Sequence, residues 1–428
     1  MIKDKLVQEV TITPQMFINP PYVECPYCKK KEFGVIHVSS ESYTRRCRSC
    51  LKSSSFSLPA LKKRIVYLDQ MAISEMMKLL NPTVDVKKKG RIKRVWKKLF
   101  EKLDRLVKLQ LIICPDSTLH YYESLVVPKY NQALKRMYEQ LSNGISFHDA
   151  EIIKRFQMSF NFRNWIGEKN LNTIDIYTVT SGDEIDGWQD RLRVSVEMGG
   201  LDKQIIDDIG RQRNQIGEQM KGVFERWQSE KGKNFMDWYE EERFVFGPMI
   251  FRDYLENIFS DNPFLLMSQT NALVIEIKKV FLEQGLSDEE ALKKTALYFK
   301  SEEIKKVLYI KISAALFASI ARKAASGQKK PPTMGDVNDI KAIASLAPYC
   351  DAMFVDNKMY SLLDEKVEGK HVREFVGLKT DFFCQNSMNK FLDYLQKIES
   401  SASKKHLEKV KEVYGESWGK PFLEMYDY

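Results

Sequence analysis

Three short apolar runs along the chain are each followed by a polar site and then by a helical pattern. They cover residues 65–69, 111–114 and 352–356, and the apolar positions within each run are consecutive. Consecutive apolar positions are typical of strands buried on both faces, as in a parallel sheet that helices cover on each side. We therefore predict an α/β fold in which these three strands are parallel and adjacent in one sheet.

Helical periodicity accounts for most of the remaining chain. Apolar residues recur at helical spacing at positions 73, 76, 77 and 80, and Asn81-Pro82 ends this helix. A second apolar stripe, from Ile92 to Leu109, predicts one long helix. Residues 147–327 are mostly helical in pattern, and a compact helix of small residues is expected over 340–347.

Composition and charge narrow the class of protein. The 428 residues are 43% hydrophobic and 29% charged, which is ordinary for a globular protein with a real core. No apolar run approaches the roughly 20 residues of a membrane span, and the N-terminus lacks the apolar centre of a signal peptide. The net charge of +9 favours an anionic partner, although many soluble proteins carry as much. Seven cysteines, four of them clustered, are typical of a reducing compartment, so we expect a cytoplasmic protein with no membrane partner.

The most specific motif is a pair of Cys-x-x-Cys knuckles separated by 18 residues. This spacing is typical of a zinc ribbon, in which four thiolates from two tight turns hold one structural zinc ion. We expect a hairpin between the knuckles, with strands at about 33–38 and 43–46. A redox dithiol is the competing interpretation, and the presence of two pairs argues against it. The expected zinc ligands are Cys25, Cys28, Cys47 and Cys50.

Positive charge gathers in two places. Between Lys87 and Lys108 there are eleven lysines and arginines, opposed only by Glu101 and Asp104. Such a run is usually a solvated helix face. Because almost all of its charges are positive, binding to phosphate is an equally good interpretation here. The second knuckle is also basic and has aromatic neighbours, which suits nucleic acid, although a ribbon that docks on its neighbour fits as well. The expected nucleic-acid contacts are Lys93, Arg94, Lys97, Lys98, Arg45 and Arg46.

Acidic residues stand where the predicted strands end. Ligands of open α/β sheets bind beyond the carboxyl ends of the strands, and both Asp69 and Asp356 follow an apolar strand there. Taken alone, Asp69 would be a turn residue that caps the next helix. After the second strand, Ser117 is an expected N-cap, and the spacing places His120 and Glu123 on the same helix face as Ser117.

Further acids come late in the chain. Asp336 and Asp339 precede the helix of small residues, and Asp351 precedes the third strand. Asp351 would lie about 16 Å from Asp356 along an extended strand, too far to share one ion unless its loop folds back. Carboxylates are the ligands that Mg²⁺ and Mn²⁺ prefer, and such ions assist phosphodiester hydrolysis. The expected set is Asp69, Glu123, Asp339 and Asp356, with His120, Asp336 and Asp351 as rival candidates.

The order of these motifs resembles the PIN-like nuclease family. The resemblance rests on residues 65–69, 116–123, 339–347 and 353–356, and it covers roughly residues 61–160 and 331–428. It implies a parallel sheet flanked by helices that gathers acidic residues around a divalent metal and cleaves RNA, less often DNA. By position, Asp69 matches the first-strand aspartate and Glu123 the acid of the mid-domain helix. Asp339 matches the acid before the small-residue helix, and Asp356 the acid that closes the fourth strand.

The long helical insertion departs from that family pattern. The predicted organisation is a zinc ribbon and lead-in over 1–60, PIN-like halves over 61–160 and 331–428, and the helical insertion over 161–330. The expected activity is that of a metal-dependent endonuclease, with RNA favoured over DNA as the substrate. Its biological role would be that of a toxin, a defence effector or a processing factor. The alternatives are an inactive nucleic-acid-binding module, or an assembly protein whose central helices bind a second copy or another protein.

Overall fold

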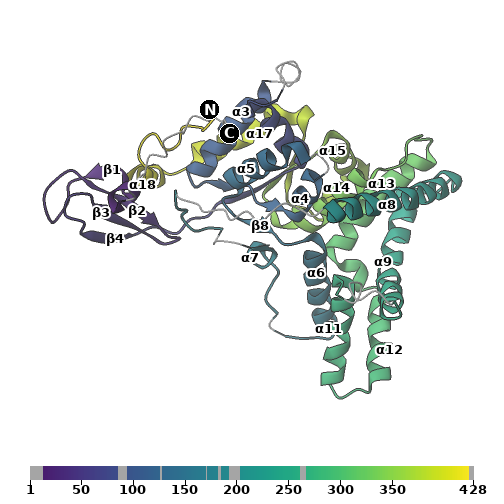
Figure 1. Cartoon of the computed structure of the whole chain (residues 1–428). Coiled ribbons are helices and arrows are strands. Elements are labelled where there is room, and N and C mark those ends of the chain that lie inside the picture. The colour runs from purple at the N-terminus through teal and green to yellow at the C-terminus, as the bar shows by residue number, and fades with distance from the viewer. Residues whose placement is uncertain are drawn as a thin grey trace, which may run out of the picture.

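The computed structural model describes residues 13–84, 94–125, 128–169, 171–181, 185–191, 203–260 and 267–423. A small antiparallel sheet lies at one end of the molecule, an α/β body lies in the centre, and long helices from the middle of the chain project from that body (Figure 1). Among the described helices, none combines the length and the apolar character that a membrane crossing requires.

The central sheet has four parallel strands in the order β13-β10-β5-β6. The strand β5 (Arg64–Leu68) lies between β10 (Ala352–Phe354) and β6 (Ile112–Ile113), with Val66 opposite Ala352 and Ile65 opposite Ile113. This arrangement confirms the prediction of three adjacent parallel strands. The sequence did not predict β13 (Asp381–Phe383), which pairs with the outer side of β10.

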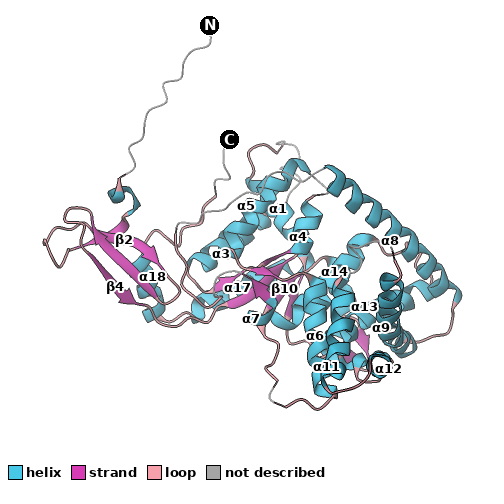
Figure 2. Cartoon of the chain, turned by 60° about the horizontal axis from the view of Figure 1, so that its bottom comes forward, coloured by secondary structure: helices cyan, strands magenta, loops and turns pink. Residues whose placement is uncertain are grey.

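Helices cover both faces of this sheet. On one face, Val66 and Leu68 of β5 share a hydrophobic core with helices α1 (Gln70–Leu80), α3 (Val95–Lys108), α5 (Asn131–Ser142) and α17 (Met388–Ser401). On the other face, Ile65 and Tyr67 join a larger core built by α6 (Ala150–Trp165), α13 (Leu308–Ala325) and α14 (Met334–Leu346). Figure 2 shows the sheet between these two sets of helices. Burial on both faces explains the consecutive apolar positions in the strand sequences.

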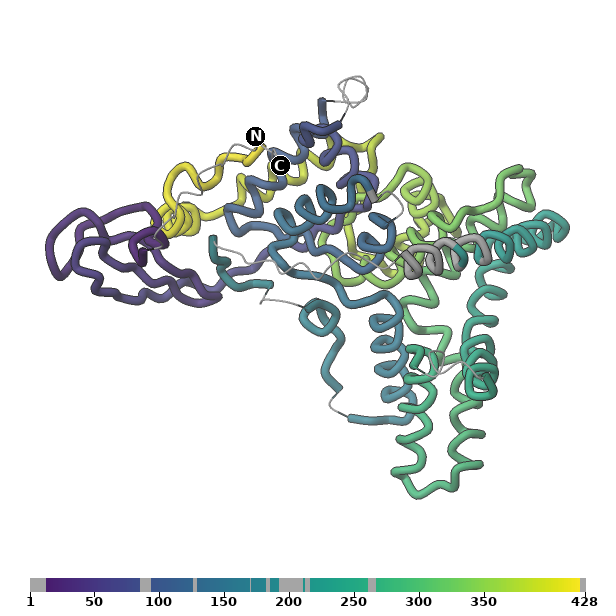
Figure 3. The backbone as a smooth tube through the Cα atoms, viewed as in Figure 1, coloured from purple at the N-terminus to yellow at the C-terminus, as the bar shows by residue number. Residues whose placement is uncertain are grey.

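The middle of the chain is helical, as predicted. Its longest helices are α8 (Lys203–Ser229), α9 (Phe235–Ile258), α11 (Gln269–Glu283) and α12 (Asp288–Phe299). The chain then returns through α13, so that the early and late strands lie side by side although the helical segment separates them in sequence (Figure 3). The hydrophobic core is continuous from Tyr67 of the sheet to Phe281 of α11.

The N-terminal sheet holds the cysteine knuckles. Its antiparallel strands are β1 (Asn19–Val23), β2 (Phe33–Val38), β3 (Ser42–Cys47) and β4 (Ser53–Ser57), in that order. The expected hairpin of β2 and β3 is confirmed, and β1 and β4 extend it. We call this sheet and its knuckles the ribbon.

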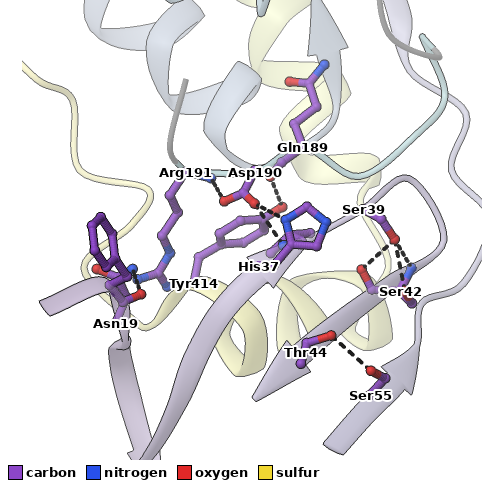
Figure 4. Close-up of polar contacts among 12 residues, drawn as sticks. Asn19, His37, Ser39, Ser42, Thr44, Ser55, Gln189, Asp190, Arg191 and Tyr414 are labelled. Carbon is purple, nitrogen blue, oxygen red and sulfur yellow. Dashed lines mark hydrogen bonds and ion pairs between the residues drawn. The ribbon is translucent and has the colours of Figure 1, made fainter. Parts of the chain in front are cut away.

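The ribbon is held to the rest of the protein by α18 (Lys404–Tyr414) and by residues 185–191. Arg45 of β3 donates a hydrogen bond of 2.7 Å to the carbonyl of Glu412, and the hydroxyl of Tyr43 donates to the same residue's carboxylate. His37 lies 2.6 Å from a carboxylate oxygen of Asp190, as Figure 4 shows. Both α18 and residues 185–191 therefore fix the ribbon in place.

The shorter described elements are η1 (Pro14–Phe17), β7 (Asp116–Ser117), α4 (Thr118–Ser124), η2 (Pro128–Tyr130), β8 (Ser146–Phe147), α7 (Ile176–Val179), β9 (Thr180–Ser181), η3 (Ile304–Lys306), η4 (Ala347–Tyr349), α15 (Asn357–Leu363), β11 (Lys366–Val367), β12 (Lys370–His371), α16 (Val372–Phe375) and η5 (Gln385–Ser387).

Candidate metal and carboxylate sites

The four knuckle cysteines converge. Their sulfur atoms all lie within 4.8 Å of one another, with 3.7 Å between Cys25 and Cys50 and 3.6 Å between Cys28 and Cys47. A tetrahedral zinc ion with bonds of about 2.3 Å holds its sulfur ligands about 3.8 Å apart, so the observed spacing fits zinc closely. Each knuckle is a tight turn closed by a backbone hydrogen bond, from Lys29 to Cys25 and from Leu51 to Cys47. The cluster is compatible with structural zinc.

The two strand acids lie side by side at the carboxyl edge of the central sheet. Asp69 follows β5 and caps α1, accepting a hydrogen bond of 3.5 Å from the amide of Met71. Asp356 follows β10 and caps α15, accepting a hydrogen bond of 2.6 Å from the amide of Met359. Because β5 and β10 are hydrogen-bonded neighbours, both acids are brought to one place. Asp69 is thus a helix cap and a member of an acidic cluster at the same time.

Two helices add the other acids. Glu123 comes from α4, whose N-cap is Ser117, and Asp339 comes from α14. A small cavity of about 20 Å³ at this point is lined by Asp69, Glu123 and Asp339, which is room on the order of one water molecule. All of the carboxylates in the cluster are partly exposed, so solvent and solutes can reach them.

Burial and mutual repulsion raise the affinity of this cluster for protons. Desolvation, followed by the charges of Glu123 and Asp356, raises the pKa of Asp69 to about 7. Desolvation, followed by the charges of Asp69 and Asp356, raises the pKa of Asp339 to about 9. The neighbouring side chains with the largest effects on both groups are acids, and each of them disfavours ionisation. A cation bound among these carboxylates would relieve that repulsion.

The carboxylates differ from the cysteines in how closely they approach one another. Among the described residues, only the cysteine cluster places three or more metal-ligand atoms within 4.8 Å of one another. The acids are electrostatically coupled, but their oxygens are more widely spaced. Hard oxygen donors in this arrangement suit an ion that keeps part of its water shell, as Mg²⁺ does.

The rival candidates take other places. His120 is buried, with Nε2 at 2.8 Å from the carbonyl of Leu68 and its ring stacked between Tyr67 and Tyr138. Burial lowers the pKa of His120 to about 4, so the imidazole is neutral. It lines the small cavity beside Asp69 and Glu123 and also supports the aromatic core.

Asp336 and Asp351 both have cationic partners. Asp336 is buried at the third position of α14, where it bonds back to Thr333 and lies 2.5 Å from the amine of Lys358. The helix thus begins before Asp336, earlier than its apolar pattern indicated, because Thr333 and Asp336 form a capping box. Asp351 lies at the opposite end of the sheet, where it accepts hydrogen bonds from Arg64 and from the amide of Ile65. Its loop does not fold back, and it is outside the cluster.

The predicted basic contacts are only partly at the surface. Arg94, Lys97 and Lys98 are exposed at the start of α3, while Lys93 lies outside the described residues. Arg46 is half-buried and donates to the carbonyl of Leu51.

Arg45 corrects the expected basic surface of the ribbon. Only 3% of Arg45 is exposed, and its guanidinium donates to the carbonyls of Pro21, Phe33 and Glu412. Alternation along β3 turns it inward on the same face as Tyr43 and Cys47. Arg45 therefore anchors the ribbon to the body, as the docking alternative expected.

Sequence reasoning missed a groove that adjoins the cluster. An open hollow of about 830 Å³ lies at the carboxyl ends of β10 and β13, where Asn357 directly follows Asp356. Polar side chains line most of it, and they include two acids that are already paired, Asp364 with Arg373 and Glu365 with Arg322 and Lys323. The amine of Lys390 pairs with no acid among the described residues. The sequence feature that could have identified Asn357 is its position directly after Asp356, the acid that follows β10. The location of Lys390 at the groove could not be inferred, because the preceding strand β13 was not predicted. The groove's exposed amides and lysine are Asn357, Asn386, Asn389 and Lys390.

Comparison of the chain with protein-family models, with curated proteins and with solved structures gave no match.

Proposed function

We propose that this protein is a divalent-metal-dependent nuclease that hydrolyses phosphodiester bonds, with RNA favoured over DNA as its substrate. The observation that carries the proposal is the convergence of Asp69, Glu123, Asp339 and Asp356 at the carboxyl edge of a parallel sheet, the edge where α/β folds bind ligands. The PIN-like motif order described above supports the same activity. The helical insertion between the two halves of the proposed catalytic domain still departs from that family pattern.

In the proposed reaction the four acids would hold Mg²⁺ or Mn²⁺. Such ions supply an activated water and offset the charge that develops on a phosphodiester. The strand acids Asp69 and Asp356 are fixed by the helix caps that they form, so they would set the position of the ions. Glu123 and Asp339 reach the same place from two helices and would complete the oxygen ligands. The raised pKa of Asp339 means that cation binding would displace a proton at neutral pH.

The surroundings favour a polynucleotide over a small phosphoester. The groove beside Asp356 presents amides that can bond to phosphate or sugar oxygens, and Lys390 adds a positive charge. The exposed residues Lys97 and Lys98 of α3 would add contacts to the backbone. One zinc ion held by the ribbon would have a structural role.

The decisive experiment is cleavage of labelled RNA and DNA with and without Mn²⁺, using Asp69→Asn. This change preserves size and the helix cap but removes the charge that a hard cation needs. We expect loss of metal-dependent cleavage by at least about a hundredfold, with folding and RNA binding retained.

Asp351→Asn is the matched control. It makes the same chemical change at the amino end of the neighbouring strand, so it should cleave like the parent. Equal cleavage by the parent and by Asp69→Asn would overturn the proposed site. Binding of RNA by the parent without any cleavage would instead favour the inactive binding module.

A further inference from the structure

A large cavity lies at the end of the sheet opposite to the carboxylate cluster. Its volume is about 650 Å³, within the range of small-molecule sites. Lys63 and Asp351, which precede β5 and β10, form part of its wall, whereas Asp69 and Asp356 follow the same strands. Residues of α6 and α7 line part of it, and these two helices lie near each other in Figures 1 and 2. A ligand here would therefore be distinct from a substrate at the carboxylates.

Three amide side chains from one face of α6 line this cavity: Gln157 is buried, Asn161 is half-buried and Asn164 is exposed. Gln157, Asn161 and Asn164 stand four and then three residues apart, so they form a row along the helix. Gln157 is buried and uses both ends of its amide, accepting from the amide of Tyr309 at 2.8 Å and donating to the hydroxyl of Tyr349 at 3.1 Å. It is thus held rigidly as part of the cavity wall.

The side-chain amides of Asn161 and Asn164 each use only one of their two polar atoms in bonds to described residues of the protein. Oδ1 of Asn161 accepts from Tyr298 at 2.9 Å, and Nδ2 of Asn164 donates to the carbonyl of Phe160 at 3.0 Å. Within the part of the chain that the structure describes, Nδ2 of Asn161 has no acceptor and Oδ1 of Asn164 has no donor. One donor and one acceptor therefore stand one helical turn apart, fixed by the bonds that the opposite ends of these amides make.

Aromatic surface completes the inner wall. Phe160 and Tyr349 line the cavity as half-buried side chains and Tyr177 lines it as an exposed one, and flat heterocycles stack on such rings. Burial raises the pKa of Tyr349 to about 12, so its hydroxyl stays protonated and offers a further donor.

The charges around the cavity are arranged unevenly. The amine of Lys63 donates to the carbonyl of Gly187 at 2.6 Å, and Asp351 is bonded to Arg64, so these charges are already satisfied within the protein. The other charged lining residues also have partners: Asp186 accepts from the amide of Lys63, Asp175 accepts from the amide of Thr178, and Lys306 lies 2.5 Å from Glu303. Lys62 is exposed and has no acidic partner among the described residues. The interior thus suits an uncharged group, and Lys62 suits an anionic one at the mouth.

From this geometry we propose that the cavity binds a nucleoside or mononucleotide, with the base against α6 and the sugar or phosphate toward Lys62. Every nucleobase is a flat ring system that presents hydrogen-bond donors and acceptors along one edge, which matches the amide row and the aromatic wall. The placement at the opposite end of the sheet makes this a separate ligand site. It does not depend on the proposed nuclease activity.

The test is calorimetric titration of the full-length protein with the four ribonucleosides and their 5′-monophosphates, without added divalent cation. Asp69→Asn protein is titrated in parallel, to exclude binding at the carboxylates. We expect saturable binding of at least one nucleoside, with an affinity that Asn161→Leu/Asn164→Leu reduces at least about tenfold, since two hydrogen bonds are lost. Asn131→Leu, on α5 at a distance from this cavity in sequence and fold, should bind like the parent.

Two further measurements fix the site. Lys62→Ala should weaken the monophosphate and leave the nucleoside unchanged. Hydrogen exchange on the unaltered protein should show ligand protection over 157–164 and 173–177, which gives an answer even if the double variant fails to fold. The proposal is overturned if no nucleoside or mononucleotide binds at millimolar concentration, or if protection falls elsewhere. Binding of RNA oligonucleotides alone would also overturn it.

Discussion

Single residues in the carboxylate cluster show the electrostatic cost of bringing acids together. Asp69 and Asp339 are held near other acids and are partly removed from water, and both gain protons more readily than free carboxyls do. Residues chosen for folding alone would avoid this repulsion. A bound cation would relieve the same repulsion.

The first prediction concerns Asp339 and pH. Its folded pKa of about 9 lies far above its ordinary value, so the folded protein holds a proton that the unfolded chain has lost. The stabilisation from this proton is complete at acidic pH and is lost as the pH rises through the folded pKa. Asp339→Asn removes that loss and should raise the free energy of unfolding of the metal-free protein by about 0.5–2 kcal/mol at about pH 8.

Urea unfolding at about pH 5 and about pH 8, without added divalent cation, measures this effect. The gain should be larger at the higher pH, because between these two values folded Asp339 keeps a proton that the unfolded chain has lost, so the stability of the parent falls as the pH rises. Asp351→Asn, which breaks an ion pair with Arg64, should show no gain at either pH. A gain for Asp339→Asn that does not change with pH would contradict the explanation.

The limits of sequence reasoning are also clearest at single residues. Asp69 and Asp356 could be predicted because an apolar strand places the next residue at the sheet edge. Arg45 could have been recognised as buried, since it alternates with Tyr43 and Cys47 along β3. By contrast, the pairing of Asp336 with Lys358 joins two helices, and no local pattern reveals it.

Among the elements, the strength of the local pattern decides what is predictable. The strands β5 and β10 carry consecutive buried apolar residues, whereas β13 begins with an exposed aspartate and has only one fully buried residue. The basic stretch before Lys108 shows a different limit. Its later part is neutralised by Glu399 of α17, which bonds Lys102 and Arg105 from almost 300 residues away. Only the three-dimensional fold separates the paired half of α3 from the exposed half.

The close approach of α9 and α12 gives the second prediction. A methyl group added at Gly247 would lie 1.9 Å from the carbonyl oxygen of Phe299, which is impossible without moving one of the helices. Gly247→Ala should therefore lower the free energy of unfolding by about 1–3 kcal/mol. Gly222→Ala on α8 is the control, because a Cβ there meets no atom within 4 Å and alanine favours helix. Thermal unfolding of both variants should move in opposite directions, and a shared direction would contradict the packing described.

The third prediction concerns the ribbon. Four thiolates around zinc contribute directly to folding, and the apolar cluster beside them is small, consisting of Phe33 and the cysteines. Removal of zinc by a chelator under reducing conditions should increase hydrogen exchange over 19–57. Exchange over β5 and β10 should stay within about twofold, because the sheet has its own core. Zinc content well below one equivalent in freshly purified protein would contradict a structural zinc.

At the scale of the whole molecule, the helical middle and the sheet share one interior. Tyr67 of the sheet, Leu316 of α13 and Phe281 of α11 belong to the same hydrophobic core. The sequence divides the chain by its change from strands to helices, but it carries no mark of which helix packs against the sheet. That relation depends on α13, which is buried along most of its length and contacts α8, α9 and α14.

The last prediction tests whether this shared interior behaves as one cooperative unit. Leu316 is fully buried, so Leu316→Ala removes packed volume at the centre and should cost about 2–5 kcal/mol. If the core is a single unit, hydrogen exchange in β5 and in α11 should accelerate by the same factor, because both would open through the same global unfolding. Leu297→Ala on α12 is the control, since that side chain is 62% exposed and contributes little packing. Faster exchange in α11 with unchanged exchange in β5 would contradict the shared interior and would make the helical segment a separate folding unit.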